Sequence, residues 1–210
     1  MDTAPQTIAL VPPALELPPV RNAEPTRKRW TRAEYYRLEE QGWFREQRVE
    51  LIDGEIILSA RLLPQHAVAI ELVRLALLQL FPNGYWVRQR FALVCDDYSE
   101  LEPDIALVHG EPDDYTEEHP KFAPLVVEIS GNSLAYDKSR KLHLYAAMGV
   151  PDYWILDLDS RQLLIYREPT ADASASFGHA YASATTLTEA DLLAPLERPN
   201  APISVAALLP

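Results

Sequence analysis

Three stretches of the chain have the spacing of apolar residues that is typical of a helix. Apolar residues recur at intervals of three and four over residues 64–81 and again over residues 134–148. A shorter helix is predicted over residues 31–42, because Thr31 and Glu34 have the spacing of a capping box. A glycine suited to ending a helix lies at or just beyond the end of each stretch.

Strand-like runs occupy most of the chain between these helices. Asp53-Gly54 divides RVELIDGEIIL, and Asp159-Ser160 separates DYWILDL from QLLIYR, so two hairpins are predicted. Further strands are predicted over the runs YWVRQRFALV, DIALV and PLVVEIS. Beyond residue 169 the strand pattern is weak. This order of elements predicts an α/β or α+β domain, with a central sheet and at least one crossover helix.

Composition adds a domain boundary and excludes several classes of protein. Residues 1–29 are rich in proline and lack periodicity, so we expect them to be disordered and residues 30–210 to form one domain. A single cysteine, Cys95, excludes an intrachain disulfide or a cysteine-rich metal fold. The chain has no apolar run long enough to span a membrane and no signal peptide, which predicts a cytoplasmic protein without membrane contact.

The charge balance restricts the possible partners. The chain carries 19 Lys and Arg against 31 Asp and Glu, a net charge of −12. A surface of this sign repels polyanions, so nucleic-acid binding would need a local basic patch or a metal ion.

Two carboxylates interrupt or adjoin strands that are otherwise apolar. Glu128 lies inside LVVEI, and Asp104 directly precedes IALV. A buried carboxylate needs a cation, a hydrogen-bond partner or a raised pKa. Two such groups at neighbouring strands could share a divalent ion, because Mg²⁺ prefers oxygen ligands. Alternatively, Glu128 pairs with a structural arginine and Asp104 only begins a turn, and the strands alone do not decide between these interpretations.

The helix that follows Glu128 favours the first interpretation. At 100° per residue, Lys141 lies at the centre of the apolar face, and Asp137 and Lys138 flank that face. A lysine at this position should extend towards the sheet and Glu128. The alternative is that its stem packs on apolar side chains while its ammonium group reaches water.

Two carboxylates and a lysine are the groups that metal-assisted phosphodiester hydrolysis requires. The carboxylates hold the metal against the phosphate, and the lysine orients or deprotonates the attacking water or stabilises charge in the transition state. Glu50, which alternates with Val49 and Leu51 in a predicted strand, is a candidate third metal ligand or an ordinary outward-facing residue.

At this point the chain resembles the Uma-type family of restriction-endonuclease-like proteins, which is common in bacteria. The resemblance covers about residues 30–170. It depends on VELIDGE (49–55), the isolated His66, EPDIALV (102–108), LVVEIS (125–130) and DKSRKLHLYAAMGVPDYWILD (137–157). The last of these motifs is the most specific.

The resemblance implies the PD-(D/E)XK nuclease fold, a central mixed β-sheet flanked by helices. It makes Asp104 and Glu128 the metal carboxylates and Glu50 an additional acidic residue. Ser130 stands where the superfamily usually has its lysine, and Lys141 on the next helix matches the family's displaced lysine. The family commonly has Ser-Pro-Ser after the glutamate, whereas Gly131, Asn132 and Ser133 follow Ser130 here. His66 has either a functional role or, as is commoner for a lone histidine at a helix start, a structural one.

The sequence therefore predicts an endonuclease that uses Mg²⁺ or Mn²⁺, needs no organic cofactor, cleaves DNA and acts as a homodimer. One alternative is an inactive nuclease fold that serves as a binding module. Another is a hydrolase of small phosphoesters, for which an acidic surface would be no obstacle. A serine hydrolase is not supported, since the chain lacks a Gly-any-Ser-any-Gly motif.

Overall fold

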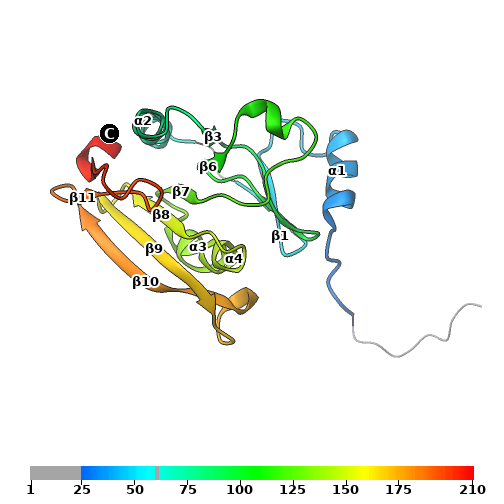
Figure 1. The fold of residues 1–210 in the computed structure, drawn as a ribbon. Coiled ribbons are helices and arrows are strands. Elements are labelled where there is room, and N and C mark those ends of the chain that lie inside the picture. The colour runs from blue at the N-terminus through cyan, green and yellow to red at the C-terminus, as the bar shows by residue number, and fades with distance from the viewer. Residues whose placement is uncertain (1–24, 60–61) are drawn as a thin grey trace, which may run out of the picture.

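The fold is built from two β-sheets that meet along the central strands of the chain (Figure 1). The computed structural model describes residues 25–59 and 62–210. The larger sheet has six strands in the order β10-β9-β8-β7-β6-β3, and the smaller has four in the order β2-β1-β5-β4. The predicted α/β architecture with a central mixed sheet is confirmed.

The strand and helix bounds are as follows. The larger sheet contains β3 (Tyr85–Gln89), β6 (Ile105–His109), β7 (Leu125–Ser130), β8 (Asp152–Asp157), β9 (Gln162–Ala171) and β10 (His179–Thr188). The smaller sheet contains β1 (Val49–Ile52), β2 (Glu55–Leu58), β4 (Leu93–Asp96) and β5 (Ser99–Leu101), and a short pair is formed by β11 (Leu192–Leu193) and β12 (Ile203–Ser204). The α-helices are α1 (Arg32–Glu40), α2 (Pro64–Leu80), α3 (Leu134–Tyr136) and α4 (Leu142–Ala147).

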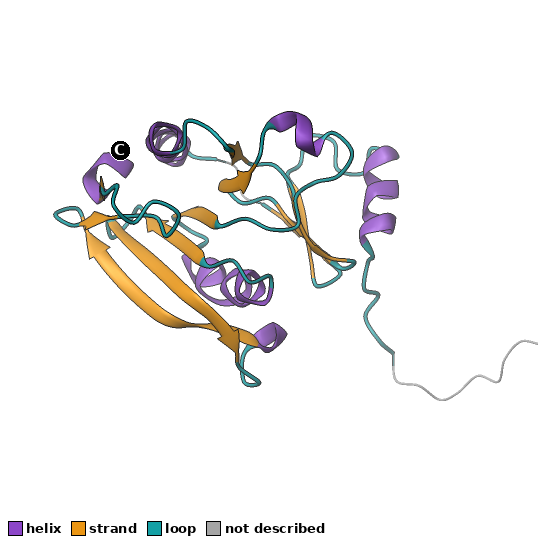
Figure 2. Ribbon diagram, in the orientation of Figure 1, coloured by secondary structure: helices purple, strands orange, loops and turns teal. Residues whose placement is uncertain are grey.

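Helices cover both faces of the larger sheet (Figure 2). Helix α2 and the C-terminal residues pack on one face, against alternate side chains such as Val127 and Trp154. Helix α4 packs on the other face, where Val126, Tyr153 and Ile155 meet its buried residues. Strands β7 and β8 are the parallel pair, and the chain between them forms α3 and α4. The predicted crossover helix is therefore confirmed.

The first hairpin and the first helix form as predicted. Asp53 and Gly54 both have positive φ, which is the backbone conformation of a two-residue hairpin turn. Thr31 and Glu34 form the reciprocal bonds of a capping box at the start of α1. Leu51 packs against α1, so the next residue along β1 in either direction faces away from that helix.

The prediction of a single strand over the run YWVRQRFALV is wrong. The run divides into β3 of the larger sheet and β4 of the smaller, and β5 is an additional strand that pairs with β4. Arg90, which lies between β3 and β4, has φ of 54°. This left-handed conformation ends β3 and redirects the chain to the second sheet.

The helix predicted over residues 134–148 contains a π-helical turn, Asp137–Lys141, between α3 and α4. The Leu142 N–H donates to the Asp137 carbonyl, the i→i−5 bond of a π-helix. The regular 100° spacing is interrupted there; within the turn Asp137 and Lys141 are buried, whereas Lys138 is exposed.

Of the segment 1–29 that was expected to be disordered, residues 1–24 lie outside the described residues. The remaining part contacts the first hairpin: Arg27 pairs with Glu55, and Arg29 bonds to Asp53. Within residues 25–59 and 62–210, no helix combines the length and the apolar character needed to cross a membrane.

The start of β8 contains a buried ion pair that should dominate local stability. Asp152 is fully buried, and its carboxylate accepts bonds from Arg167, the Trp154 indole and the Leu196 N–H. Asp152→Ala should lower the free energy of unfolding by about 3–5 kcal/mol, because it leaves Arg167 without its counter-charge. Urea denaturation measures this loss. Glu189→Ala, which breaks an exposed pair, is the control and should have little effect; equal effects would contradict the prediction.

Candidate functional site

The candidate site is a cavity of about 350 Å³ at the junction of the two sheets. Strands β1 and β7, the start of β6, the first turn of α2 and the π-helical turn all contribute to its wall. The charged side chains that line it are Arg48, Glu50, Arg90, Asp104, Glu128, Asp137, Lys141 and Asp159. Apolar side chains also contribute to the wall: Ile57, Leu58, Leu62, Leu63 and Leu158.

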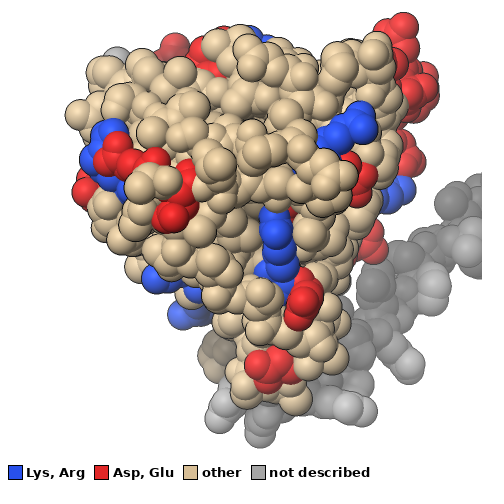
Figure 3. Space-filling model, turned by 60° about the vertical axis from the view of Figure 1, so that its left-hand side comes forward, with Lys and Arg blue, Asp and Glu red and all other residues tan. Residues whose placement is uncertain are grey.

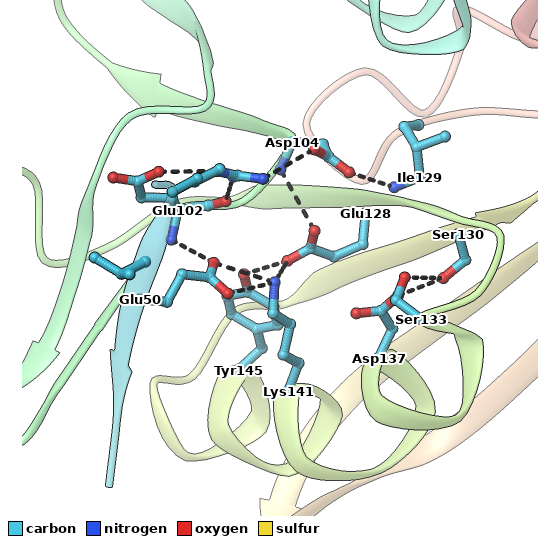
Figure 4. Close-up of polar contacts among 12 residues, drawn as sticks. Glu50, Glu102, Asp104, Glu128, Ile129, Ser130, Ser133, Asp137, Lys141 and Tyr145 are labelled. Atoms are coloured by element: carbon cyan, nitrogen blue, oxygen red, sulfur yellow. Dashed lines mark hydrogen bonds and ion pairs between the residues drawn. The ribbon is translucent and has the colours of Figure 1, made fainter. Parts of the chain in front are cut away.

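Lys141 joins the two sheets through its ammonium group (Figure 4). Its Nζ lies 2.9 Å from Glu128 Oε1 and 3.2 Å from Glu50 Oε1, and its side chain is 9% exposed. Burial alone would lower the pKa of Lys141, but the charges of Glu128, Glu50 and Asp137 outweigh it and raise this pKa. Lys141 is therefore a fixed cation, which favours electrostatic stabilisation over proton abstraction from water.

Glu128 reaches the same point from the centre of β7. Its Oε1 also accepts the Tyr145 hydroxyl at 2.7 Å, and its Oε2 lies 3.4 Å from the Asp104 nitrogen. Burial raises the pKa of Glu128 to about 8, although Lys141 acts in the opposite direction. A carboxyl group with a raised pKa beside a cation is typical of a functional site.

Asp104 lies beside Glu128 because β6 and β7 are neighbouring antiparallel strands. Its Oδ2 accepts the Ile129 N–H at 3.0 Å and lies 3.0 Å from His66 Nε2. Arg48 is 3.7 Å from Oδ1. Burial alone would raise the pKa of Asp104, but His66, the Ile129 N–H and Arg48 together lower it. Asp104 therefore stays ionised more readily than Glu128, whose pKa is raised.

Glu50 lies on the cavity side of β1, opposite to the face that packs on α1. Besides Lys141, it accepts the Glu102 N–H at 2.8 Å. Glu50 is buried, so it is not the outward-facing strand residue that the sequence left as an alternative.

A second polar cluster supports the π-helical turn (Figure 4). The hydroxyl groups of Ser130 and Ser133 both donate to Asp137 Oδ2. This cluster fixes the end of β7 to the turn from which Lys141 projects. Ser130 and Asp137 therefore lie next to the elements that carry Glu128 and Lys141, but do not bond to Asp104 or Glu128 themselves.

The structure brings most of the predicted site residues together. Asp104, Glu128, Lys141, Glu50 and His66 form one connected network, and Ser130 and Asp137 adjoin it. Lys138 is exposed and is not among the residues of the cavity wall. Glu128 pairs with Lys141 and not with an arginine, and the Lys141 ammonium group is buried and does not reach water as the alternative had it.

Three residues were not singled out from the sequence: Arg48 and Arg90, which line the cavity, and Tyr145, which bonds to Glu128 behind it. Arg48 is two positions before Glu50, the spacing that places both on one face of a strand. Tyr145 is four positions after Lys141, and it was assigned to the apolar face without a role for its hydroxyl. Arg90 had no local signal, because its position depends on the turn that separates β3 from β4.

The donor atoms of the site fit a magnesium or manganese ion. No three His, Cys, Asp or Glu side chains of the described residues are grouped as they would be around an ion. Mg²⁺ commonly takes only one or two carboxylates and completes its shell with water and substrate phosphates. Asp104 and Glu128 provide such a pair on adjacent strands, and Glu50 lies on the other side of Lys141 from Glu128 as a further carboxylate of the site.

The comparisons with known proteins agree with this fold. The sequence profile of the Uma2 family, described as "Putative restriction endonuclease", matches residues 32–198. No curated protein is significantly similar to the chain. A solved structure, the "putative nuclease belonging to DUF820 from Anabaena variabilis ATCC 29413", superposes with a TM-score of 0.62 at 16% identity, over 85% of this chain and 96% of that chain. The fold is therefore restriction-endonuclease-like, as the sequence predicted.

Proposed function

Because the chain belongs to the Uma2 family of putative restriction endonucleases, we propose that it is a metal-dependent endonuclease that hydrolyses phosphodiester bonds of DNA. The observation that carries the proposal is the Lys141 ammonium group, held between Glu128 and Glu50 in the cavity that also contains Asp104. A buried cation beside two carboxylates suits a reaction in which negative charge increases on a phosphate.

Asp104 and Glu128 would hold Mg²⁺ or Mn²⁺, which neutralises phosphate charge and acidifies a bound water when present. Lys141 provides a fixed positive charge for the transition state, because its raised pKa keeps it protonated. The Tyr145 hydroxyl fixes the position of Glu128 by a hydrogen bond, and Glu50 fixes the position of Lys141 in the same way. Buried donors in fixed positions cost little reorganisation during the reaction.

The remaining predicted residues have supporting roles in this proposal. His66, which is within hydrogen-bond distance of Asp104, orients that carboxylate from the start of α2. Ser130 takes the place of the lysine usual in the superfamily and anchors Asp137 instead. Gly131 and Asn132, which depart from the Ser-Pro-Ser that is common in the family, line the cavity and take no part in these contacts.

We extend the proposal to the organisation of the protein. Residues 30–210 act as one domain, which is supported by the bonds of Lys141 to strands of both sheets. A homodimer would present two active sites to the two strands of a duplex. The described chemistry uses side chains and a metal ion, and it needs no organic cofactor.

Cleavage of supercoiled plasmid DNA tests the proposal. The protein should convert the plasmid to open-circular and linear forms with Mg²⁺ or Mn²⁺, and EDTA should abolish this conversion. A small phosphodiester that competes fully at equal concentration would instead indicate a hydrolase of small phosphoesters. Absence of cleavage of DNA and RNA with every divalent metal would refute the nuclease proposal and leave a binding module.

A further inference from the structure

The acidic surface raises the question of how this protein would hold a polyanion. The net charge of the chain is −12. On the face shown in Figure 3, basic and acidic side chains are intermixed and most of the surface is uncharged. Counterion release at a broad basic surface, which supplies most non-specific nucleic-acid affinity, is therefore weak on this face. On this face, phosphate recognition would have to come from individual cations.

Three basic side chains line the cavity, and two of them form ion pairs with carboxylates of the protein. Lys141 pairs with Glu128 and Glu50. Arg48 donates to the Glu102 carboxylate at 2.9 Å and lies 3.7 Å from Asp104. Within the part of the chain that the structure describes, no carboxylate lies in ion-pair distance of the third, Arg90. Arg90 is therefore the cation of the cavity with charge to spare.

Arg90 is also incompletely hydrogen-bonded. Its Nε is buried and has no partner among the described residues, although the side chain lines the cavity. A buried donor without an acceptor costs free energy, so hydrogen bonds within the described residues do not explain the position of the Arg90 side chain.

The backbone holds Arg90 beside the central carboxylates. Its N–H donates to the carbonyl groups of Pro103 and Asp104, both at 3.2 Å. Its φ of 54° is uncommon for a residue other than glycine. A strained backbone is retained where the surrounding structure or a function requires the position.

A second arginine, Arg88, provides a comparison for Arg90, because its guanidinium has other contacts within the fold. The Arg88 Nε is likewise buried without a partner. However, the Arg88 guanidinium lies 4.7 Å from the Trp86 ring, close to the Phe91 and Tyr115 rings, and within 3.4 Å of His119 Nδ1, so it has cation–π and polar contacts within the fold. Arg90 has no such aromatic contact among the described residues, and it lines the cavity whereas Arg88 does not.

We propose that Arg90 binds a non-scissile phosphate of the nucleic-acid strand and so positions the neighbouring phosphodiester at Asp104 and Glu128. This inference rests on the proposed function. A guanidinium suits the role because its fork of donors matches two phosphate oxygens. Arg90 is thus a phosphate-binding residue, and its charge, which no carboxylate among the described residues pairs with, lies beside the reaction centre.

The test compares the wild type with Arg90→Gln in binding and in cleavage. Anisotropy of a short fluorescein-labelled DNA duplex in EDTA should show about tenfold weaker binding for Arg90→Gln. The slope of log affinity against log salt should decrease by about one unit, the value for one lost phosphate contact. With Mg²⁺, KM should rise about tenfold with little change in kcat, since a remote phosphate contact acts on ground state and transition state alike.

Two further variants keep the test decisive. Arg74→Gln is the matched control, because Arg74 pairs with Glu71 on α2 outside the cavity and should bind and cleave as the wild type does. Arg90→Gly also removes the guanidinium, but it suits the positive φ, so it should fold even if Arg90→Gln does not. Thermal unfolding verifies both Arg90 variants.

The outcomes separate the two proposals. Equal affinity, salt slope and KM for the wild type and both Arg90 variants would overturn the role of Arg90 and leave the nuclease intact. Binding that depends on Arg90 in a protein that cleaves no nucleic acid would support the phosphate site and refute the nuclease.

Discussion

Replacing Lys141 with methionine should reduce the rate of DNA cleavage by roughly 10²- to 10³-fold, the loss typical when one electrostatic donor is removed from an active site. Methionine keeps an unbranched apolar stem, so packing around α4 is largely preserved. What is lost is the ammonium group that bonds to Glu128 and Glu50. Initial rates of plasmid cleavage with saturating Mg²⁺ measure the effect on kcat.

The matched control is Lys138→Met, because Lys138 belongs to the same π-helical turn but is exposed. It should cleave at the wild-type rate. Lys141→Met leaves two buried carboxylates without a counter-charge, which destabilises the fold by about 3–5 kcal/mol. Lys141→Arg keeps the charge and should fold, yet its larger guanidinium cannot occupy the ammonium position, so cleavage should still fall at least about tenfold. Wild-type rates in Lys141→Arg and in folded Lys141→Met would show that Lys141 is only structural.

The sequence could predict the position of Lys141 because it depends on local geometry. A helix places residues at fixed angles, and a lysine at the centre of an apolar face must approach the sheet on which that face packs. Glu128 precedes the same helix, so the contact between them spans only 13 residues. The contact forms although the helix contains a π-helical turn that the spacing did not predict.

Contacts between distant parts of the chain were not predictable in the same way. Arg48 and Asp104 are brought together because the two sheets meet, and nothing near either residue encodes this meeting. Arg90 is itself the left-handed residue that divides an apparently continuous strand. The alternation of the run YWVRQRFALV favours one strand, and the break is visible only because β3 and β4 pair within different sheets. Local periodicity therefore predicts elements, whereas the junction of sheets decides which charges share the cavity.

Removing either central carboxylate should abolish metal binding and cleavage together. Asp104 and Glu128 are neighbours on adjacent strands, and two carboxylates are the usual protein share of a magnesium shell. Isothermal titration of Mn²⁺ should show at least about tenfold weaker binding to Asp104→Asn and to Glu128→Gln, since each loses one charged ligand. Cleavage by either variant should fall about 10²-fold or more.

Glu100→Gln is the control for the loss of a buried carboxylate. Glu100 is as buried as Glu128, but it bonds to Tyr36 on α1 and does not line the cavity. It should bind Mn²⁺ and cleave DNA as the wild type does. If Asp104→Asn and Glu128→Gln retained wild-type affinity for Mn²⁺, the metal would lie elsewhere. Glu128 would then be a structural partner of Lys141 and Tyr145, whose contacts with it need no metal.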